Sequence, residues 1–122
     1  MSELVKSVDQ EAMTAWGELS RDRNPLHVDP AFAAGTRYGR TILHGHLTVA
    51  WLCEWALQQW GTAWLTLGEI AALRYRRPLH AQEELRVRGA LEPGGTSARV
   101  VVLKPDGEEA VVATLRLRGA PA

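Results

Sequence analysis

The sequence predicts an α+β domain in which an antiparallel sheet curls around one long, buried helix. Residues 47–60 have a helical composition and are apolar on nearly every side, which is typical of a helix enclosed by other elements. Later segments alternate apolar with polar residues and are separated by turns rich in glycine and proline. A buried helix followed by such a meander indicates an α+β architecture.

The first predicted helix covers residues 8–20. Ser7 and Gln10 fit a capping box at its start. Behind them, apolar residues recur at the spacing of one helix face, which is the periodicity expected of an amphipathic helix. The cap and the periodicity together place the two ends.

A mostly irregular stretch is expected over residues 21–45, which are rich in polar residues, glycine and proline. One short helix is predicted within it, over residues 30–34, because Asp29 can cap a helix and Pro30 suits the first helical position. Irregular loops held by a rigid scaffold are where catalytic groups concentrate. This stretch is therefore the first place to expect a functional site.

The central helix over residues 47–60 contains no proline or glycine and stops at Gly61, a residue type common just past helix ends. It contains Cys53, and a cysteine in such a setting usually behaves as a small buried hydrophobe. Tryptophans recur in and just after this helix, and most are expected to be core or dimer contacts: Trp51, Trp55, Trp60 and Trp64.

Strands are predicted after this helix, over residues 66–77, 84–91, 97–103 and 110–118. The alternation is clearest over residues 85–88, where leucine and valine alternate with arginine. Pro-Gly-Gly over residues 93–95 and Pro-Asp-Gly over residues 105–107 are turn sequences between successive strands. These strands are the ones expected to wrap the helix.

Length and composition predict one domain over residues 1–122. Lys plus Arg and Asp plus Glu each total 14, so the chain lacks the basic field expected of a nucleic-acid binder. Cys53 is the only cysteine, which excludes an intramolecular disulfide and a multi-cysteine metal site. No segment is long and apolar enough to span a membrane, and residues 1–6 do not resemble a signal peptide, so a cytoplasmic location is expected.

Asp22 and His27 are the leading candidates for catalysis. Asn24-Pro25 between them is a turn dipeptide that can fold the two side chains toward one point. A carboxylate beside an imidazole can orient a water molecule and move protons near neutral pH. Asp22 and Asn24, taken singly, also have structural explanations. Asp22 could cap a helix or a turn, and Asn24 could be an ordinary turn residue.

Gly45 adds a third element, because it lies between His44 and His46 where the central helix begins. A glycine at a helix start offers a backbone N–H at the positive end of the helix dipole, which suits a developing oxyanion. The missing side chain also lets a ligand approach closely. Turn structure alone does not explain this glycine together with Asp22 and His27.

Other chemistries fit this sequence less well. A metal site would use His27, His44 and His46 with an aspartate, but their spacing matches no helical or ribbon ligand pattern, so no metal is expected. Cys53 lies deep in the apolar helix, where a nucleophilic role is not expected. No phosphate-binding glycine loop or dinucleotide fingerprint is present.

Two segments resemble the hydratase 2 motif of the MaoC-like dehydratases, the group that includes the (R)-specific enoyl-CoA hydratases. The first reads LSRDRNPLHVDPAFAA over residues 19–34, and the second reads ILHG over residues 42–45. The motif is long and specific. Weaker similarity continues through the central helix and residues 75–79, so the resemblance spans most of the chain.

The resemblance implies a hot-dog fold, in which an antiparallel sheet wraps a central helix, and a homodimer with the acyl-thioester tunnel near the subunit interface. It implies that Asp22 and His27 activate water, which adds across a trans-2-enoyl thioester to give the (R)-3-hydroxyacyl product, or catalyse the reverse dehydration. The Gly45 amide would stabilise the enolate-like state, and Asn24 would hold the loop in shape. Coenzyme A or acyl carrier protein would enter as part of the substrate, with no separate cofactor.

Further substrate contacts are expected around the catalytic pair, from Asn24, His44 and His46. Arg74, Arg76 and Arg77 could meet the phosphates of coenzyme A, although alternating charge is equally typical of an exposed strand.

Three positions depart from the typical family pattern. Cys53 stands where (R)-hydratases often carry a serine that supports the catalytic pair. His46 follows the His-Gly pair where methionine or leucine is more usual, and it is a candidate to line the pocket. Gln82-Glu83 replaces a common Gly-Asp turn.

The alternatives are two. A hot-dog thioesterase would hydrolyse the thioester, but the central helix offers no obvious carboxylate for it except Glu54. A non-catalytic acyl-thioester-binding partner subunit would be expected to have a damaged Asp/His pair, and Asp22 and His27 are both present. A hydratase or dehydratase, which is a lyase of fatty acid metabolism, is therefore favoured.

Overall fold

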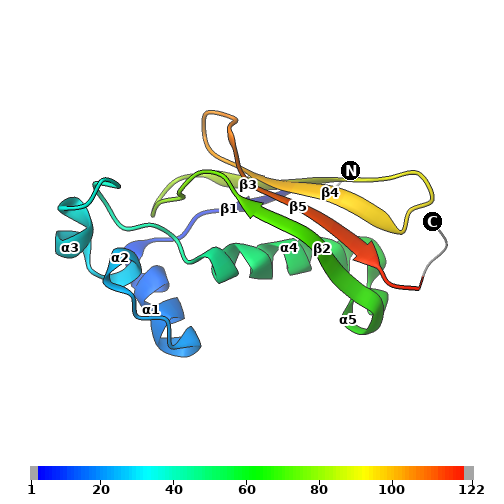
Figure 1. The fold of residues 1–122 in the computed structure, drawn as a ribbon, viewed down its shortest axis with the longest axis horizontal. Coiled ribbons are helices and arrows are strands. Elements are labelled where there is room, and N and C mark those ends of the chain that lie inside the picture. The colour runs from blue at the N-terminus through cyan, green and yellow to red at the C-terminus, as the bar shows by residue number, and fades with distance from the viewer. Residues whose placement is uncertain (1–2, 120–122) are drawn as a thin grey trace.

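A twisted antiparallel sheet wraps one long helix in this computed structural model, which describes residues 3–119 (Figure 1). The predicted α+β class and the hot-dog arrangement are confirmed. The helices are α1 (Gln10–Ser20), α2 (Pro25–Val28), α3 (Pro30–Ala34), α4 (Gly45–Trp60) and α5 (Ala63–Leu67). The strands are β1 (Glu3–Lys6), β2 (Gly68–Tyr75), β3 (Leu85–Leu91), β4 (Ser97–Leu103) and β5 (Glu109–Leu117).

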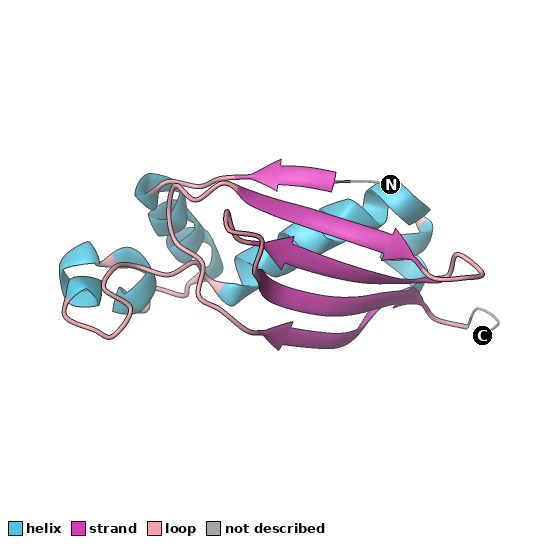
Figure 2. Cartoon of the chain, turned by 90° about the horizontal axis from the view of Figure 1, so that it is seen from above, coloured by secondary structure: helices cyan, strands magenta, loops and turns pink. Residues whose placement is uncertain are grey.

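The strands lie in the order β1-β3-β4-β5-β2, and all neighbouring strands are antiparallel (Figure 2). β3, β4 and β5 follow one another as hairpins, which confirms the predicted meander. Gly94, Gly95 and Gly107 in the two turns have φ values of 95°, 75° and 89°, which glycine adopts without strain. β2 pairs with the far side of β5, so that Tyr75 lies opposite Val111.

α4 lies along the inner face of the sheet and buries one side, which carries Leu47, Trp51, Leu52 and Trp55, whereas His46, Ala50, Leu57 and Gln58 are exposed. The prediction of a helix enclosed on nearly every side is therefore confirmed for that face and wrong for the opposite one. α4 begins at Gly45 and ends at Gly61, whose amide donates to the Leu57 carbonyl oxygen at 2.8 Å. The Trp55 ring lies so close to β3 that a Cβ on Gly89 would be 2.3 Å from it. Glycine at that position therefore lets the strand pass directly over the ring. No helix within residues 3–119 is long and apolar enough to cross a membrane.

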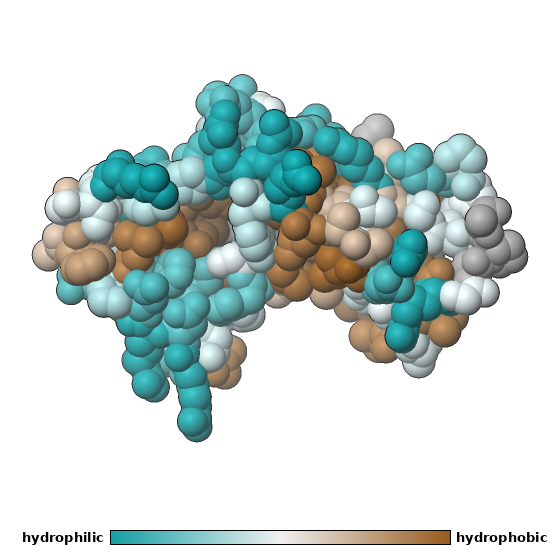
Figure 3. Space-filling view, in the orientation of Figure 1, coloured by the Kyte–Doolittle hydropathy of each residue, from teal (hydrophilic) through white to brown (hydrophobic). Residues whose placement is uncertain are grey.

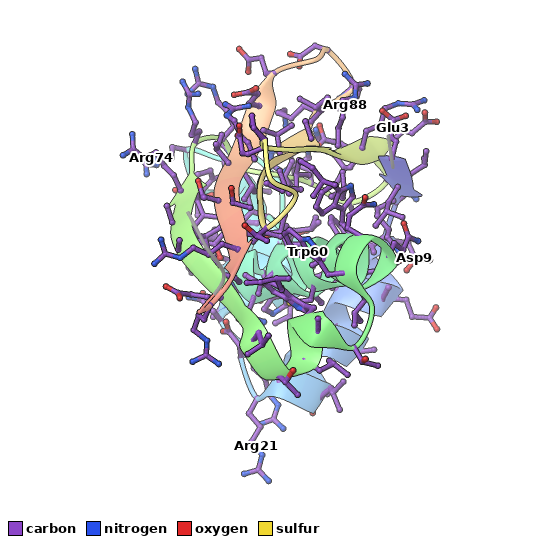
Figure 4. All side chains as sticks on the ribbon, turned by 90° about the vertical axis from the view of Figure 1, so that its right-hand side faces the viewer. Glu3, Asp9, Arg21, Trp60, Arg74 and Arg88 are labelled. Carbon is purple, nitrogen blue, oxygen red and sulfur yellow. The ribbon has the colours of Figure 1, made fainter. Side chains whose placement is uncertain are left out.

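The expected core role of the tryptophans is confirmed for most of them. Trp51, Trp55 and Trp64 are 6%, 1% and 8% exposed. Trp60 is partly buried, stacks on Trp64 with ring centroids 5.9 Å apart, and lies between the helices and the sheet at one end of the molecule (Figure 4). Cys53 is partly buried and packs against the same core.

α1 is capped by a different residue from the one predicted. Asp9 is the N-cap, and its carboxylate accepts from the Ala12 amide at 2.8 Å. The predicted capping box of Ser7 and Gln10 is therefore wrong. Gln10 is the first helical residue, and its side-chain amide donates to the His27 carbonyl oxygen at 3.0 Å, so a tertiary contact replaces the local one.

Three short elements are not indicated by the sequence patterns: β1, α2 and α5. The first two have four residues each, too few to show a period. α5 takes the start of the strand predicted over residues 66–77, so β2 begins at Gly68. The short helix predicted over residues 30–34 is confirmed as α3, with the Asp29 side chain accepting from the Phe32 amide at 3.1 Å.

Candidate active site

Asn24 and Pro25 turn the chain between Asp22 and His27. The Asn24 side-chain oxygen caps α2 by accepting from the Leu26 amide at 3.0 Å, and Pro25 takes the first helical position. The Asp22 carboxylate accepts from the Asn24 amide at 3.4 Å. The turn brings a carboxylate oxygen of Asp22 and a ring nitrogen of His27 within 4.8 Å of each other.

One nitrogen of the His27 ring is anchored on the backbone. Nδ1 lies 2.8 Å from the Ile42 carbonyl oxygen. Because a carbonyl oxygen can only accept, Nδ1 carries the proton of the neutral ring. The lone pair is therefore on Nε2, and this nitrogen can take a proton from a bound molecule.

His44 is fully buried beside His27, and the two rings stack with centroids 4.1 Å apart. Nε2 of His44 donates to the Asp22 carbonyl oxygen at 2.8 Å, whereas Nδ1 has no hydrogen-bond partner among the described residues. Burial lowers the pKa of His44 below its ordinary value of 6.5, which favours the neutral ring. Gly17 on α1 makes room for this contact, because a Cβ there would lie 3.0 Å from the Asp22 carbonyl oxygen.

The Asp22 carboxylate also contacts His46 in the first turn of α4. Oδ2 of Asp22 lies 3.1 Å from Nε2 of His46, and Nδ1 of His46 accepts from Nε1 of Trp16 at 2.7 Å. The hydrogen bond with His46 is the largest cause that lowers the pKa of Asp22 below 3.8. The carboxylate is therefore ionised at neutral pH.

Gly45 is the first residue of α4, so its amide is among those that have no partner inside the helix. The end of the Tyr75 side chain covers this glycine, and a Cβ on it would lie 2.8 Å from Cζ and 2.9 Å from the hydroxyl oxygen. Burial raises the pKa of Tyr75, so the phenol keeps its proton at neutral pH. Thr48 donates to the Gly45 carbonyl oxygen at 2.6 Å and so stabilises the first turn.

A cavity of about 650 Å³ opens beside these groups, a size that suits a small organic ligand. The short helix α2, the start of α4 with the residue before it, and the end of β2 contribute to its lining, which includes His27, His44, Gly45, Thr48 and Tyr75. The remaining wall combines apolar with cationic side chains, among them Leu43, Leu79, Val111, Arg37, Arg76 and Arg77. An apolar chain and an anionic group could both be accommodated there.

The arginines on the cavity wall are partly paired with carboxylates. Arg76 lies 3.6 Å from Glu109, and Arg77 lies 3.3 Å from Glu108. The two arginine side chains are 51% and 55% exposed, so a ligand phosphate can reach them and compete with these weak surface pairs. Arg37 lies over the ring of its neighbour in the chain and adds a third cation to the wall.

Asp22, His27 and His44 come close enough together to raise the question of a metal ion. A shared ion would need the lone pairs of both imidazoles to converge on one point at about 2 Å from each nitrogen. The stacked rings, with only 27° between their planes, direct their lone pairs in nearly parallel planes. This geometry fits a set of hydrogen-bonding groups better than a metal centre.

The predicted site residues fall into two groups. His27, His44, Gly45, Arg76 and Arg77 line the cavity. Asp22, Asn24 and His46 are not among the lining residues, but Asp22 and Asn24 form the turn beside it and His46 bonds to Asp22. The catalytic and substrate-binding roles given to these residues stay predictions.

The sequence patterns do not predict three residues that contact the candidate site: Trp16, Gly17 and Tyr75. Trp16 and Gly17 lie on α1, and their importance depends on how that helix packs against the loop. Tyr75 lies at the start of the weakly similar stretch 75–79, which is the one signal that could have drawn attention to it.

The chain is similar to known proteins over most of its length. The sequence pattern described as MaoC like domain matches residues 2–110. An (R)-specific enoyl-CoA hydratase of Aeromonas caviae is 36% identical over 83 residues, which are 67% of this chain and only 60% of that relative's length.

Two solved structures share the architecture. An (R)-hydratase from A. caviae, described as involved in PHA biosynthesis, has a TM-score of 0.75 and 28% identity, covering 95% of this chain and 92% of that one. The unliganded R-hydratase PhaJ1 from Pseudomonas aeruginosa has a TM-score of 0.72 and 25% identity, covering 95% of this chain and 78% of that one.

Proposed function

Because this chain belongs to the MaoC-like domain family, we propose that it is a lyase that hydrates trans-2-enoyl thioesters to (R)-3-hydroxyacyl thioesters, or dehydrates them in reverse. The proposal depends above all on the pairing of His27 with Asp22. A ring nitrogen of His27 and an oxygen of the ionised carboxylate lie within 4.8 Å, a gap that one hydrogen-bonded water molecule can bridge. The similarity to named (R)-hydratases supports the reaction class.

Water is held by both side chains in the proposed reaction. One O–H group donates to the Asp22 carboxylate and the other to Nε2 of His27. As the water oxygen bonds to C3 of the enoyl group, Nε2 of His27 takes one proton of the water and then delivers that proton to C2 of the enolate, while the other proton stays on the new C3 hydroxyl group. One water molecule is consumed and no proton is left over. In the reverse direction, a proton leaves C2 and the hydroxyl group leaves C3 as water.

Charge develops on the thioester oxygen while C3 is attacked. The amide of Gly45 is the proposed donor to this oxygen, because it lies at the positive end of the α4 dipole and on the cavity wall. Removing one such donor typically costs on the order of 100-fold in rate. Asn24, which caps α2, holds the loop that positions the pair.

The substrate in this proposal is an acyl thioester of coenzyme A or of acyl carrier protein. Leu43, Leu79 and Val111 on the cavity wall suit the apolar chain. Arg76 and Arg77, expected to meet phosphates, lie on the same wall and suit the anionic carrier. The reaction itself adds or removes water, so it requires no redox cofactor.

The alternatives are less well supported by the geometry. Glu54, the carboxylate that a thioesterase could use from the central helix, forms an ion pair with Lys6 at 2.6 Å and does not line the cavity. A non-catalytic binding subunit would not need the anchored tautomer of His27 beside an ionised Asp22. The hydratase is therefore the function that the site supports best.

We also propose a homodimer formed along β2. This strand is at one edge of the sheet, and Leu73 and Tyr75 on it are 37% and 54% exposed. Hydrophobic side chains gather in the middle of the face that carries β2, between hydrophilic areas (Figure 3). Because Tyr75 also lines the cavity, the interface would lie near the site. Light scattering should give twice the mass of the chain, and Leu73→Arg should give the mass of a monomer.

Hydration of crotonyl-CoA tests the proposed function directly. The enoyl absorbance should fall with the native protein, and Asp22→Asn and His27→Ala should each lower the rate at least ~100-fold. Asp106→Asn, in the exposed β4–β5 turn, makes the same chemical change away from the site and should leave the rate unchanged. Release of free thiol without hydration would indicate a thioesterase. No reaction with any enoyl thioester, including long-chain and carrier-protein forms, would contradict the proposal.

A further inference from the structure

A line of hydrogen bonds joins α1 to the Asp22 carboxylate through His46. The indole N–H of Trp16 donates to Nδ1 of His46 at 2.7 Å, and Nε2 of His46 lies 3.1 Å from Oδ2 of Asp22. The Trp16 and His46 rings are in contact, with centroids 5.8 Å apart. Because the two residues lie 30 positions apart in the sequence, this contact exists only in the folded chain.

Trp16 decides which nitrogen of His46 carries the proton. An indole N–H can only donate, so Nδ1 of the neutral imidazole must be the acceptor. The proton is then on Nε2, beside the Asp22 carboxylate, which can only accept. The two hydrogen bonds are satisfied together by this tautomer alone.

Asp22 has few other contacts that fix its side chain. The remaining hydrogen bond to its carboxylate within residues 3–119 comes from the Asn24 amide at 3.4 Å, which is long. The carboxylate is 38% exposed. The titratable groups that face it are His46 from α4, His27 from α2 and His44 before α4. Of these, His46 makes the direct side-chain hydrogen bond.

We propose that His46 is a positioning residue for the hydratase reaction: it holds the Asp22 carboxylate in the orientation that receives water, and Trp16 holds His46 in the required tautomer. The reaction named here rests on the proposed function. His46 does not line the cavity, so it acts through Asp22 instead of touching the substrate. One lone pair of Oδ2 is taken by His46, and the other acceptor sites of the carboxylate stay open for water.

Kinetics of variants at His46 separate the hydrogen bond from the shape of the side chain. His46→Leu removes the donor, and we expect kcat to fall about tenfold with little change in KM, since misplacing a catalytic group by about 1 Å can cost up to 100-fold. His46→Gln places an amide N–H near the former Nε2 and should restore most of kcat. Equal losses in both variants, or unchanged kcat in His46→Leu, would overturn the proposal.

Trp16→Phe tests the hydrogen bond between His46 and Asp22 in a second way, because it removes the indole N–H but leaves His46 in place. We expect a smaller loss of kcat, because His46 can then adopt the other tautomer and lose its bond to Asp22. Adding Trp16→Phe to His46→Leu should cause no further loss of kcat, because the two residues act on one bond. Additive losses would show that Trp16 acts independently and would contradict the proposed line. Circular dichroism and thermal unfolding identify any variant that fails to fold.

Nitrogen NMR of the histidine rings tests the hydrogen bonds without substrate. His46 should be the Nε2-protonated tautomer in the native protein and a mixture in Trp16→Phe. His80, whose Nδ1 lies 2.9 Å from the Thr41 carbonyl oxygen, should show the opposite tautomer and serves as the internal control. The pKa of Asp22, followed by its carboxyl carbon signal, should rise in His46→Leu. An Nδ1-protonated His46 would overturn the proposal even if hydration occurs, whereas the expected spectra in a protein without hydratase activity would contradict only the proposed function.

Discussion

The stacked rings of His27 and His44, with centroids 4.1 Å apart, carry their protons on opposite nitrogens. His27 donates from Nδ1 to the Ile42 carbonyl oxygen, and His44 donates from Nε2 to the Asp22 carbonyl oxygen, both at 2.8 Å. Two stacked imidazoles repel each other if both are charged. Burial lowers the pKa of His44 and so favours its neutral form. In the proposed reaction, the free Nε2 of His27 is the ring nitrogen that takes the proton.

The buried His44 should make stability depend on pH. Its folded pKa lies below 6.5, so between that folded pKa and 6.5 the unfolded chain binds more protons than the folded one. The free energy of unfolding should therefore fall as pH drops below 6.5 toward the folded pKa. His44→Gln, which keeps a donor for the Asp22 carbonyl oxygen, should flatten this part of the curve. Urea denaturation above and below pH 6.5 gives the change of unfolding free energy with pH for the native protein and for His44→Gln. Equal changes in the two proteins would contradict a lowered pKa of His44 as the cause.

Gly17→Ala should destabilise the protein although alanine is the better helix former. A Cβ at this position meets the Asp22 carbonyl oxygen at 3.0 Å and Val28 Cγ1 at 3.1 Å, and the first of these is backbone that cannot rotate away. Overpacking of this kind costs about 1–3 kcal/mol, against a gain in helix propensity of about 1 kcal/mol. Chemical denaturation measures the net loss, and Ala15→Gly on the exposed face of α1 calibrates the propensity alone. A gain in stability would show that the loop gives way.

Gly45→Ala should lower activity with little loss of stability. The three atoms nearest to the new methyl group would all belong to the end of the Tyr75 side chain, which is 54% exposed and can swing away. Activity should fall about 100-fold, because the methyl group crowds the approach to the amide. Adding Tyr75→Ala removes the collision and should not restore the rate. If the double variant recovers kcat, displacement of Tyr75 is the cause and the oxyanion role of Gly45 is wrong.

Arg76→Gln and Arg77→Gln should weaken binding of coenzyme A thioesters if these side chains meet phosphates. The loss should appear in KM, by roughly tenfold for each lost contact with a charged group. Crotonyl-N-acetylcysteamine has no phosphates, so its KM should not change in either variant. Equal changes in KM for both substrates would assign the arginines to the structure of the strand end, where they pair with Glu109 and Glu108.

Most of the fold could be predicted because local sequence patterns indicate its main helix and strands. The central helix is marked by its apolar composition and by Gly61, and the hairpins by the glycine turns at 93–95 and 105–107. The elements without such patterns could not be predicted. β1, for example, is a strand because it pairs with β3, which is a contact between segments far apart in the sequence. Gln10 likewise reaches across to the His27 carbonyl oxygen instead of completing a local cap.

The turn that brings Asp22 near His27 could be predicted from the sequence, whereas other contacts of the candidate site could not. Asp22 and His27 are five positions apart and are joined by the turn dipeptide Asn24-Pro25. Their proximity can therefore be predicted from the local sequence alone. The contact of His46 with Trp16 depends instead on how α1 lies against the start of α4. Tyr75 reaches Gly45 only because β2 pairs with β5 at the edge of the sheet.

The pairing of β2 with β5 also determines when the cavity can form during synthesis of the chain. The segment from Asp22 to Gly45 is made before β5, whose pairing with β2 completes the opposite wall of the cavity. The amides of Arg76 and Arg77 both donate to the carbonyl oxygen of Ala110, at 2.7 and 3.2 Å. A nascent chain that has not reached β5 therefore has Asp22 and His27 but lacks the opposite wall of the cavity. We therefore expect substrate binding only after β5 has been made and has paired with β2.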